Sequence, residues 1–420
     1  MKRSIGLGAL FRINDSTQEN GEEFIDTLSS SAHKKRSMRI SRPFKRNILR
    51  FNKSNIQGDR DKALKRSSLR LKNLPSCNIY VKPVEKVTKI YSKRALEAPN
   101  MTDDFYLNLL DWSKENVIAI GLECCVFLLN DSNNQISQII PSNGKTLITS
   151  VSWMTICKNR LAIGLNNGRV EIWDTDKLQR IRTLKGHSKR VSALSWNCNI
   201  LSTGSLDSLI LSHDVRDKSH LIDQFKYHSK EVCGLKWSPD GIQLASGSND
   251  NHLCIWDINI MKRPKFALKS HKAAVKALSW ASQDKNLLVS GGGKLDKSIK
   301  FWDTEEGTEI YSLRTNGQVC SLLWSDNSRE LVTSHGYEKS QFFVWKYLPH
   351  KPEMPLVQTG ELIGHKSRIL HTTLSPNGST VASTSPEDQT LRFWRVFDKK
   401  SEFPFSDFIG PSSFFKNVFR

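Results

Sequence analysis

The sequence predicts an all-β fold, a seven-bladed WD-repeat β-propeller preceded by a basic arm. Two observations carry this prediction. An apolar-alternating segment that ends in tryptophan recurs along the chain, and a second series, typically ending in Trp-Asp, recurs about twenty residues after each copy of the first. The composition agrees, because 38% of the 420 residues are hydrophobic and can form a large core.

The first series sets the repeat length. Its successive copies are 41 to 50 residues apart, close to the ~40–45 residues of a four-stranded propeller blade. Its members end at Trp112, Trp153, Trp196, Trp237, Trp280, Trp324 and, in the last copy, Leu374. The second series contains Leu129, Trp173, His213, Trp256, Trp302, Trp345 and Trp394. One four-stranded sheet cannot bury both of its faces alone, so seven blades are expected to close into a ring.

Histidines precede several repeats, and an aspartate follows each of them 20 to 25 residues later. The pairs are His187 with Asp207, His228 with Asp250, His271 with Asp296, and His365 with Asp388. Because the pattern repeats with the fold, we interpret these residues as buried structural pairs rather than catalytic or metal-binding groups. A strand serine such as Ser246 and a tryptophan N–H would complete their hydrogen bonds.

Ring closure is expected to use both ends of the repeat region. Few residues follow Trp394 before the tail, so the run 89–96 is predicted to supply the outermost strand of the last blade. An edge strand closed in this way is protected from pairing with another chain. The predicted organisation is an arm at 1–94, a propeller at 95–397 and a tail at 398–420.

Charge is concentrated in the arm. Residues 1–95 carry 23 basic and 8 acidic side chains, which accounts for +15 of the formal net charge of +20. The hydrophobic residues there have no steady period, so the arm is expected to be extended and largely disordered. Such an arm could bind nucleic acid, serve as a nuclear-import signal or dock onto an acidic protein.

Several protein classes are excluded by the sequence. The longest nearly apolar run, 117–129, is too short for a membrane span of about 20 residues, and the N-terminus has no signal-peptide pattern. The eight cysteines lack Cys-x-x-Cys spacing, which favours buried thiols in a reducing, intracellular compartment. No phosphate loop, nucleophile elbow or zinc-binding motif is present, so the chain is expected to be a recognition scaffold without cofactor or metal, and not an enzyme.

Specific stretches then point to a family. Residues 96–112 (LEAPNMTDDFYLNLLDW), 231–241, 247–251, 318–324 and 364–368 closely resemble the Fizzy and Fizzy-related proteins, which activate the anaphase-promoting ubiquitin ligase. The resemblance covers roughly 90–397. It implies a substrate adaptor that captures degradation motifs of proteins such as cyclins and securin-like proteins, works in the nucleus and cytoplasm, and is open to pseudosubstrate inhibitors.

The resemblance also implies two motif-binding sites. The site for a Lys-Glu-Asn (KEN) motif would use Asp104, Asn249, Asn251, Lys294, Gln318 and Arg368. Carboxylates and amides there can bind the Lys and Asn of the peptide, and Arg368 can bind its Glu. Lys294 stands where the family usually has Thr. The site for an Arg-x-x-Leu motif would use Glu97 and Gln389, and the loss of one carboxylate at Gln389 predicts weaker recognition.

The arm and tail are expected to dock onto the ligase. Ile48, Leu49 and Arg50 match a docking element of the family, whereas residues 22–26 lack the Arg and Pro of its first box. Phe419 and Arg420 resemble the family's terminal Ile-Arg, which implies docking onto a helical-repeat subunit. Residues 1–95 contain no Ser-Pro or Thr-Pro, so control by cyclin-dependent kinases is expected to be weak. These departures suggest a specialised, meiotic fungal member.

A second hypothesis is a propeller scaffold of a nuclear nucleic-acid complex, with the basic arm on RNA or DNA. The arm has few aromatic residues between its basic clusters, which argues against base stacking and makes nucleic acid the weaker choice.

Overall fold

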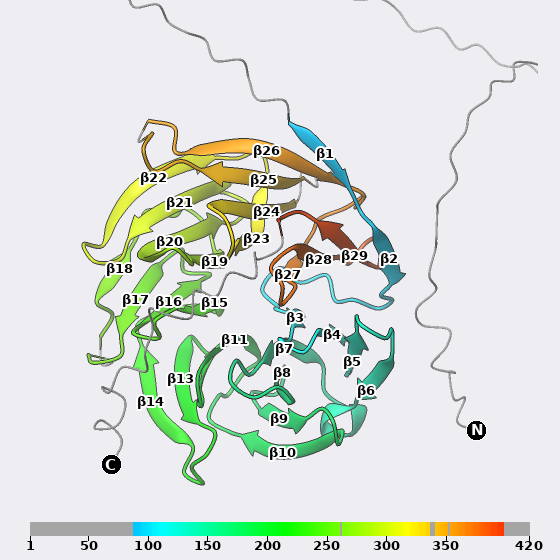
Figure 1. The fold of residues 1–420 in the computed structure, drawn as a ribbon. Coiled ribbons are helices and arrows are strands. Elements are labelled where there is room, and N and C mark those ends of the chain that lie inside the picture. Colours follow the sequence, from blue (N-terminus) through cyan, green and yellow to red (C-terminus); the bar gives the residue numbers. More distant parts are fainter. Residues whose placement is uncertain (1–86, 261–262, 337–340, 352, 399–420) are drawn as a thin grey trace, which may run out of the picture. The chain divides into compact units, whose positions relative to one another are not determined.

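A computed structural model describes residues 87–398 apart from 261–262, 337–340 and 352. Seven β-sheets follow one another around a ring, as Figure 1 shows, so the predicted seven-bladed propeller is confirmed. The docking residues Ile48, Leu49, Arg50, Phe419 and Arg420 lie outside the described residues.

The first four sheets are antiparallel and contain four strands each. The first contains β3 (Leu110–Trp112), β4 (Val117–Leu122), β5 (Cys125–Asn130) and β6 (Ile136–Ile139), and the short 3-10 helix η2 (Pro141–Gly144) follows it. The second contains β7 (Ile148–Trp153), β8 (Arg160–Leu165), β9 (Val170–Asp174) and β10 (Gln179–Leu184). The third contains β11 (Val191–Asn197), β12 (Ile200–Ser205), β13 (Leu209–Asp214) and β14 (Leu221–Lys226). The fourth contains β15 (Val232–Trp237), β16 (Gln243–Ser248), β17 (Leu253–Asp257) and β18 (Phe266–Leu268).

Two of the last three sheets differ from the others, because each takes a strand from the N-terminal side of the ring. The fifth contains β19 (Val275–Ala281), β20 (Asp284–Gly292), β21 (Ser298–Asp303) and β22 (Thr308–Arg314). The sixth contains β23 (Gln318–Trp324), β24 (Glu330–Gly336), β25 (Phe342–Tyr347) and β26 (Leu356–Ile363), with β1 (Thr88–Tyr91) at its edge. The seventh contains β27 (His371–Leu374), β28 (Thr380–Ser385) and β29 (Thr390–Arg395), with β2 (Arg94–Glu97) outermost.

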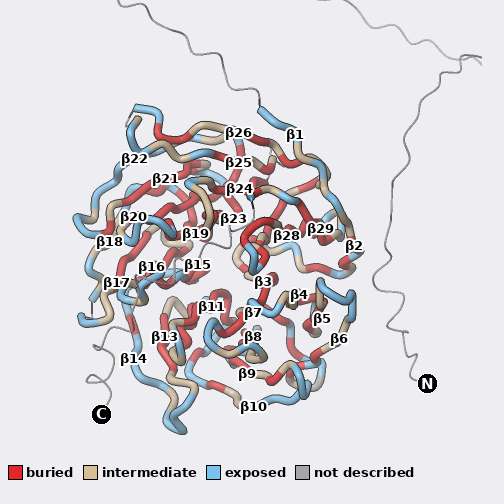
Figure 2. Tube along the Cα trace, in the orientation of Figure 1, coloured by how far each residue is buried: buried red, intermediate tan, exposed pale blue. Residues whose placement is uncertain are grey.

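The core lies between neighbouring blades. Figure 2 shows buried residues along the inner and middle strands, whereas outer strands such as β10 and β14 are largely exposed. Trp256 and Trp394, each from a third strand, are among the largest fully buried side chains. Apolar residues on both faces of a middle strand therefore pack against two neighbouring sheets, as the repeat pattern predicts.

The predicted closure is confirmed for half of the run 89–96. β2 pairs antiparallel with β29, with Leu96 opposite Leu391, and so completes the seventh blade. The preceding residues do not extend that strand. β1 instead pairs parallel with β26, with Ile90 opposite Leu362, and adds a fifth strand to the sixth blade. Ile90 packs against the apolar cluster between the sixth and seventh blades, which explains why the chain leaves one blade for the next.

The His–Asp pairs form as predicted. In the fourth blade, His228 Nδ1 lies 3.1 Å from a carboxylate oxygen of Asp250, and its Nε2 lies 2.8 Å from the Ser246 hydroxyl. Trp256 donates its indole N–H to the same hydroxyl, 2.8 Å away. Burial alone would raise the pKa of Asp250, but the hydrogen bond and charge of His228 lower it.

The same arrangement recurs in other blades. The remaining pairs are His187 with Asp207, His271 with Asp296, and His365 with Asp388. In the third blade His213 replaces the tryptophan, and its Nδ1 lies 3.0 Å from Nδ1 of His220. Burial, together with the charge of His220, lowers the pKa of His213 to about 3. These polar groups are therefore used by the fold and not by a reaction.

Candidate functional site

A hollow of about 560 Å³ opens at one end of the blades. Successive strands of an antiparallel sheet run in opposite directions, so the residues before a first strand and the turn between the second and third strands share one end. The hollow is built from such residues in the fourth to seventh blades, together with the segment between β2 and β3. Its lining residues are Asp103, Asp104, Phe105, Tyr106, Lys230, Asn249, Asn251, Lys272, Ala273, Ala274, Gly293, Lys294, Leu295, Gln318 and Arg368.

All six residues expected at the Lys-Glu-Asn site line this hollow. Asn249 and Asn251 come from the turn between β16 and β17, and Lys294 comes from the turn between β20 and β21. Gln318 begins β23, and Arg368 precedes β27. The fold thus brings together residues that are up to 264 positions apart, from Asp104 to Arg368.

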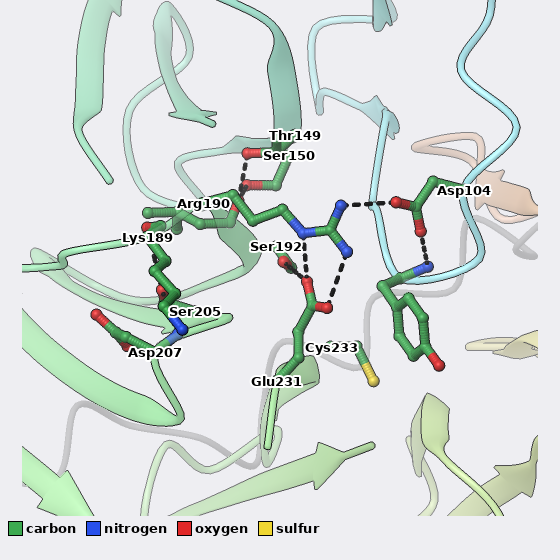
Figure 3. Close-up of polar contacts among 12 residues, drawn as sticks. Asp104, Thr149, Ser150, Lys189, Arg190, Ser192, Ser205, Asp207, Glu231 and Cys233 are labelled. Atoms are coloured by element: carbon green, nitrogen blue, oxygen red, sulfur yellow. Dashed lines mark hydrogen bonds and ion pairs between the residues drawn. The ribbon is translucent and has the colours of Figure 1, made fainter. Parts of the chain in front are cut away.

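Asp104 belongs to an ion-pair network that the sequence analysis missed. Arg190 lies between two carboxylates, as Figure 3 shows, and its Nη1 is 2.6 Å from Oδ2 of Asp104. Its Nε and Nη2 donate to Glu231 over 2.7 and 2.8 Å, and Ser192 donates to the same carboxylate. Burial would lower the pKa of Arg190, but Glu231 and Asp104 outweigh this and raise it.

The sequence contains a signal that could have revealed this network. Arg190 and Glu231 each stand immediately before the valine that begins a first strand, Val191 or Val232. Because equivalent positions of neighbouring blades meet around the ring, opposite charges at such positions are expected to pair. Asp104 has a further hydrogen bond, because the backbone N–H of Tyr106 donates to its carboxylate over 2.9 Å. The Asp104 carboxylate is therefore held in place from two sides.

Arg368 is held by a further acidic residue that the sequence analysis did not select. Its Nε donates to Oδ1 of Asp103 over 2.6 Å, and its Nη2 donates to the Asp103 carbonyl over 3.1 Å. The Arg368 side chain is only 11% exposed, whereas that of Asp103 is 42% exposed. The guanidinium is thus positioned at the wall of the hollow before any ligand arrives.

Two amide side chains offer hydrogen-bonding capacity to a ligand. Gln318 is 4% exposed, and its Oε1 has no hydrogen-bond partner among the described residues. A buried acceptor without a partner costs free energy, which a ligand donor would recover. Asn251 has a left-handed backbone with φ of 70°, a conformation that asparagine tolerates better than most residues. That conformation fixes where the Asn251 side chain leaves the turn.

A buried lysine packs against Phe105, one of the residues that line the hollow. Lys276 is 5% exposed, donates to the carbonyl of Leu370 over 3.0 Å and lies 5.5 Å from the ring centroid of Phe105. Burial lowers its pKa to about 8. Phe105 also packs with Ala274, Cys320 and Leu370, so the segment carrying Asp103 and Asp104 is anchored to the ring.

Glu97 and Gln389 also come together, away from the hollow. The N–H of Ala98 donates to the carbonyl of Gln389 over 2.6 Å, and Glu97 lies opposite Thr390 in the β2–β29 pair. Both side chains are exposed. They lie at the junction of the seventh and first blades, where Leu96 packs into the cluster shared by those blades.

The described residues contain no group of three or more His, Cys, Asp or Glu side chains that could hold a metal ion. Their seven cysteines are free thiols. The prediction of buried thiols holds for Cys233, Cys254 and Cys320, whereas Cys124, Cys125 and Cys157 are half-buried and Cys198 is exposed. Burial raises the pKa of Cys320 to about 12. No helix within 87–398, where the structure describes it, is both long enough and apolar enough to cross a membrane.

Comparison with known proteins gives the family. Residues 96–394 match the family model described as the CDC20/Fizzy WD40 domain. The chain is 49% identical over 315 residues to "Anaphase-promoting complex subunit cdc20" of Dictyostelium discoideum, which covers 74% of this chain and 62% of that relative. It is 44% identical over 327 residues to "Protein FIZZY-RELATED 3" of Arabidopsis thaliana, which covers 78% and 66% of the two chains.

The similarity to a solved structure agrees with this family match. A chain in the "Crystal Structure of Mitotic Checkpoint Complex" superposes with a TM-score of 0.71 at 40% identity, and the match covers 76% of this chain and 95% of that one. This chain spans less than two thirds of the length of several of these relatives, 62% in the Dictyostelium case. The matched region nevertheless includes the strands from β3 to β28 and all the residues that line the hollow described above. The chain therefore belongs to the CDC20/Fizzy family of WD40 proteins.

Proposed function

We propose that this chain is a noncatalytic substrate adaptor that activates the anaphase-promoting ubiquitin ligase. The names of its relatives support this proposal, because one is an "Anaphase-promoting complex subunit" and another, from Arabidopsis thaliana, is a "cofactor of APC complex". The similarity to a chain of the mitotic checkpoint complex suggests that this protein also meets inhibitors that mimic substrates.

The hollow is the proposed site for a Lys-Glu-Asn motif. The observation that carries this proposal is that the six residues implied by the family resemblance line one cavity. In this arrangement Arg368 pairs with the peptide Glu, while Asn251 and the unpaired Oε1 of Gln318 bond the Asn and Lys of the peptide. Asp104 supplies the negative charge for the peptide lysine, and the positive charge of Lys294 repels that lysine.

A second motif, Arg-x-x-Leu, is proposed to bind at the junction of the seventh and first blades. Glu97 is the carboxylate for the peptide arginine there, and Gln389 adds an amide oxygen without charge. A charged partner makes a stronger hydrogen bond than a neutral one, so this motif is expected to bind more weakly than in a site with two carboxylates.

Docking onto the ligase is assigned to the ends of the chain. Ile48, Leu49 and Arg50 form the proposed arm element, and Phe419 and Arg420 the proposed tail that enters a helical-repeat subunit. Cyclins and securin-like proteins are the proposed substrates, in the nucleus and cytoplasm. The restriction to meiosis in a fungal lineage stays a prediction from the sequence departures.

The motif site is tested by removing two amides without disturbing the backbone. Asn251→Gly keeps a left-handed turn accessible, and Gln318→Met keeps the side-chain volume. The double variant is expected to weaken binding of a fluorescent Lys-Glu-Asn peptide at least about tenfold, the equivalent of one good hydrogen bond to a charged or polar group. Asn134→Gly is the matched control, because Asn134 has a similar φ of 59° and is exposed in the first blade.

Equal peptide affinity in the double variant and the control would refute the site assignment. The ligase role is tested separately by deleting Phe419 and Arg420 and measuring copurification with the anaphase-promoting complex. Loss of copurification is expected. Unchanged association, together with tight and salt-sensitive RNA binding by the full chain, would instead favour the nucleic-acid scaffold.

A further inference from the structure

The hollow is more basic than a site for a lysine-containing motif requires. Its lining includes Lys230, Lys272, Lys294 and Arg368, against the carboxylates Asp103 and Asp104, which leaves a formal net charge of +2. The adjoining Arg190–Glu231 pair adds no net charge. A free peptide lysine entering this hollow therefore meets an excess of positive charge.

The two carboxylates are also already paired. Asp103 accepts from Arg368, and Asp104 accepts from Arg190 at 2.6 Å. Arg368 and Asp103 neutralise one another, whereas Arg190 faces both Asp104 and Glu231, so those three residues keep one negative charge. That charge offsets one of the three lysines, and the net charge of +2 remains. The lysines that line the hollow lie on the fourth and fifth blades.

Three lysines mark that side. Lys230 and Lys272 precede the first strands of the fourth and fifth blades, and Lys294 lies in the turn between β20 and β21 of the fifth. All three side chains are exposed, and Lys230 and Lys272 form no side-chain ion pair with any described residue. The first strands of these blades are in direct contact, so the lysines border the same part of the ring. Converging ammonium groups are a common way to bind a doubly charged anion.

We propose that the hollow selects degradation motifs with a phosphorylated serine or threonine next to them, and that Lys230, Lys272 and Lys294 bind its phosphate. This inference rests on the proposed motif-binding function and adds a substrate class to it. A phosphate carries about −1.5 to −2 charges near pH 7, so it offsets the +2 of the lining and the charge of the peptide lysine better than one carboxylate does. Phosphorylation by a kinase would then switch a substrate on.

The test compares fluorescent peptides by anisotropy at about 0.15 M salt, where only close charges interact strongly. Each peptide contains Lys-Glu-Asn with a serine two residues before or after it, and is made with serine or phosphoserine. Matched peptides carry three alanines in place of the motif. At least one phosphopeptide is expected to bind about tenfold more tightly than its serine form, as one or two charge-assisted hydrogen bonds allow.

The variants assign the effect to the lysines. The double variant Lys272→Ser with Lys294→Thr is expected to reduce the phosphate-dependent gain to less than about threefold. Lys226→Ser, on the exposed outer strand β14, should keep the full gain and so controls for the loss of a surface charge away from the hollow. A gain that survives in the double variant, or phosphopeptides that bind no better than serine peptides, would overturn the inference.

The outcomes separate the inference from the function on which it rests. If serine peptides bind in a motif-dependent way but phosphate adds nothing, the motif site stands and the phosphate selectivity falls. If the alanine peptides bind as tightly as the motif peptides, the motif site itself falls, and any phosphate gain is then nonspecific attraction, which also overturns the inference.

Discussion

Removing one buried hydroxyl from the fourth blade should destabilise the propeller strongly. Ser246 is fully buried, accepts the indole N–H of Trp256 over 2.8 Å and contacts Nε2 of His228 over 2.8 Å. In the neutral imidazole that donates its Nδ1–H to Asp250, Nε2 accepts the Ser246 O–H. Ser246→Ala therefore leaves one donor and one acceptor unpaired in the core.

The size of the effect follows from those two groups. Each buried polar group without a partner costs about 1–3 kcal/mol, so the free energy of unfolding should fall by about 2–6 kcal/mol. Urea unfolding, followed by tryptophan fluorescence and circular dichroism together, measures it and checks that a single transition occurs. Ser229→Ala is the control, because Ser229 is exposed and only its backbone N–H contacts Asp250. A loss below about 0.5 kcal/mol in Ser246→Ala, no more than an ordinary surface substitution, would refute the reasoning.

Three further predictions concern charge. Burial lowers the folded-state pKa of His213 to about 3 and of His335 to about 4, below their ordinary value of 6.5, so the unfolded chain binds protons first as pH falls. Below pH 6.5 each of these two histidines should lower the free energy of unfolding by about 1.4 kcal/mol per pH unit, until the pH reaches its folded-state pKa. Urea unfolding curves that coincide at pH 7 and pH 5 would contradict this prediction. Arg190→Met should cost about 3–5 kcal/mol in urea unfolding by stranding the buried Glu231 carboxylate, and adding Glu231→Gln should restore part of that loss. Gln389→Glu should tighten an Arg-x-x-Leu peptide about tenfold in anisotropy, and unchanged affinity would place the peptide arginine elsewhere.

The repeat made the fold predictable. The copies share their spacing and turn residues, and four of them contain a His–Asp pair, so the blade number and the buried role of His228 and Asp250 follow from the repeat. The division of the closing segment into two strands, β1 and β2, was harder to predict. Residues 89–96 form one apolar-containing run in the sequence, and only the packing of Ile90 against the sixth blade divides it into β1 and β2.

The candidate site was predictable to a different extent. Its six expected residues came from the family resemblance, and the fold brings them to one hollow. The ion pairs that hold two of them were missed, although the equivalent positions of Arg190 and Glu231 in neighbouring blades could have predicted one of these contacts. The contacts of Asp103 and Asp104 depend on the path of the segment between β2 and β3, which repeat spacing does not give.

One position of the repeat explains how a symmetric ring acquires an asymmetric site. The residue just before the first-strand valine is Arg190, Glu231, Ala274 and Gln318 in four successive blades. The residue type at that position varies in charge and size, whereas the valine that follows it is the same in all four blades. In the four blades this position therefore carries a cation (Arg190), an anion (Glu231), a small apolar side chain (Ala274) and an amide (Gln318). Substitutions of Ala274 or Gln318, which line the hollow, should change which peptide is bound while the buried His–Asp pairs keep the ring intact, since these residues share no side-chain hydrogen bond with the pairs.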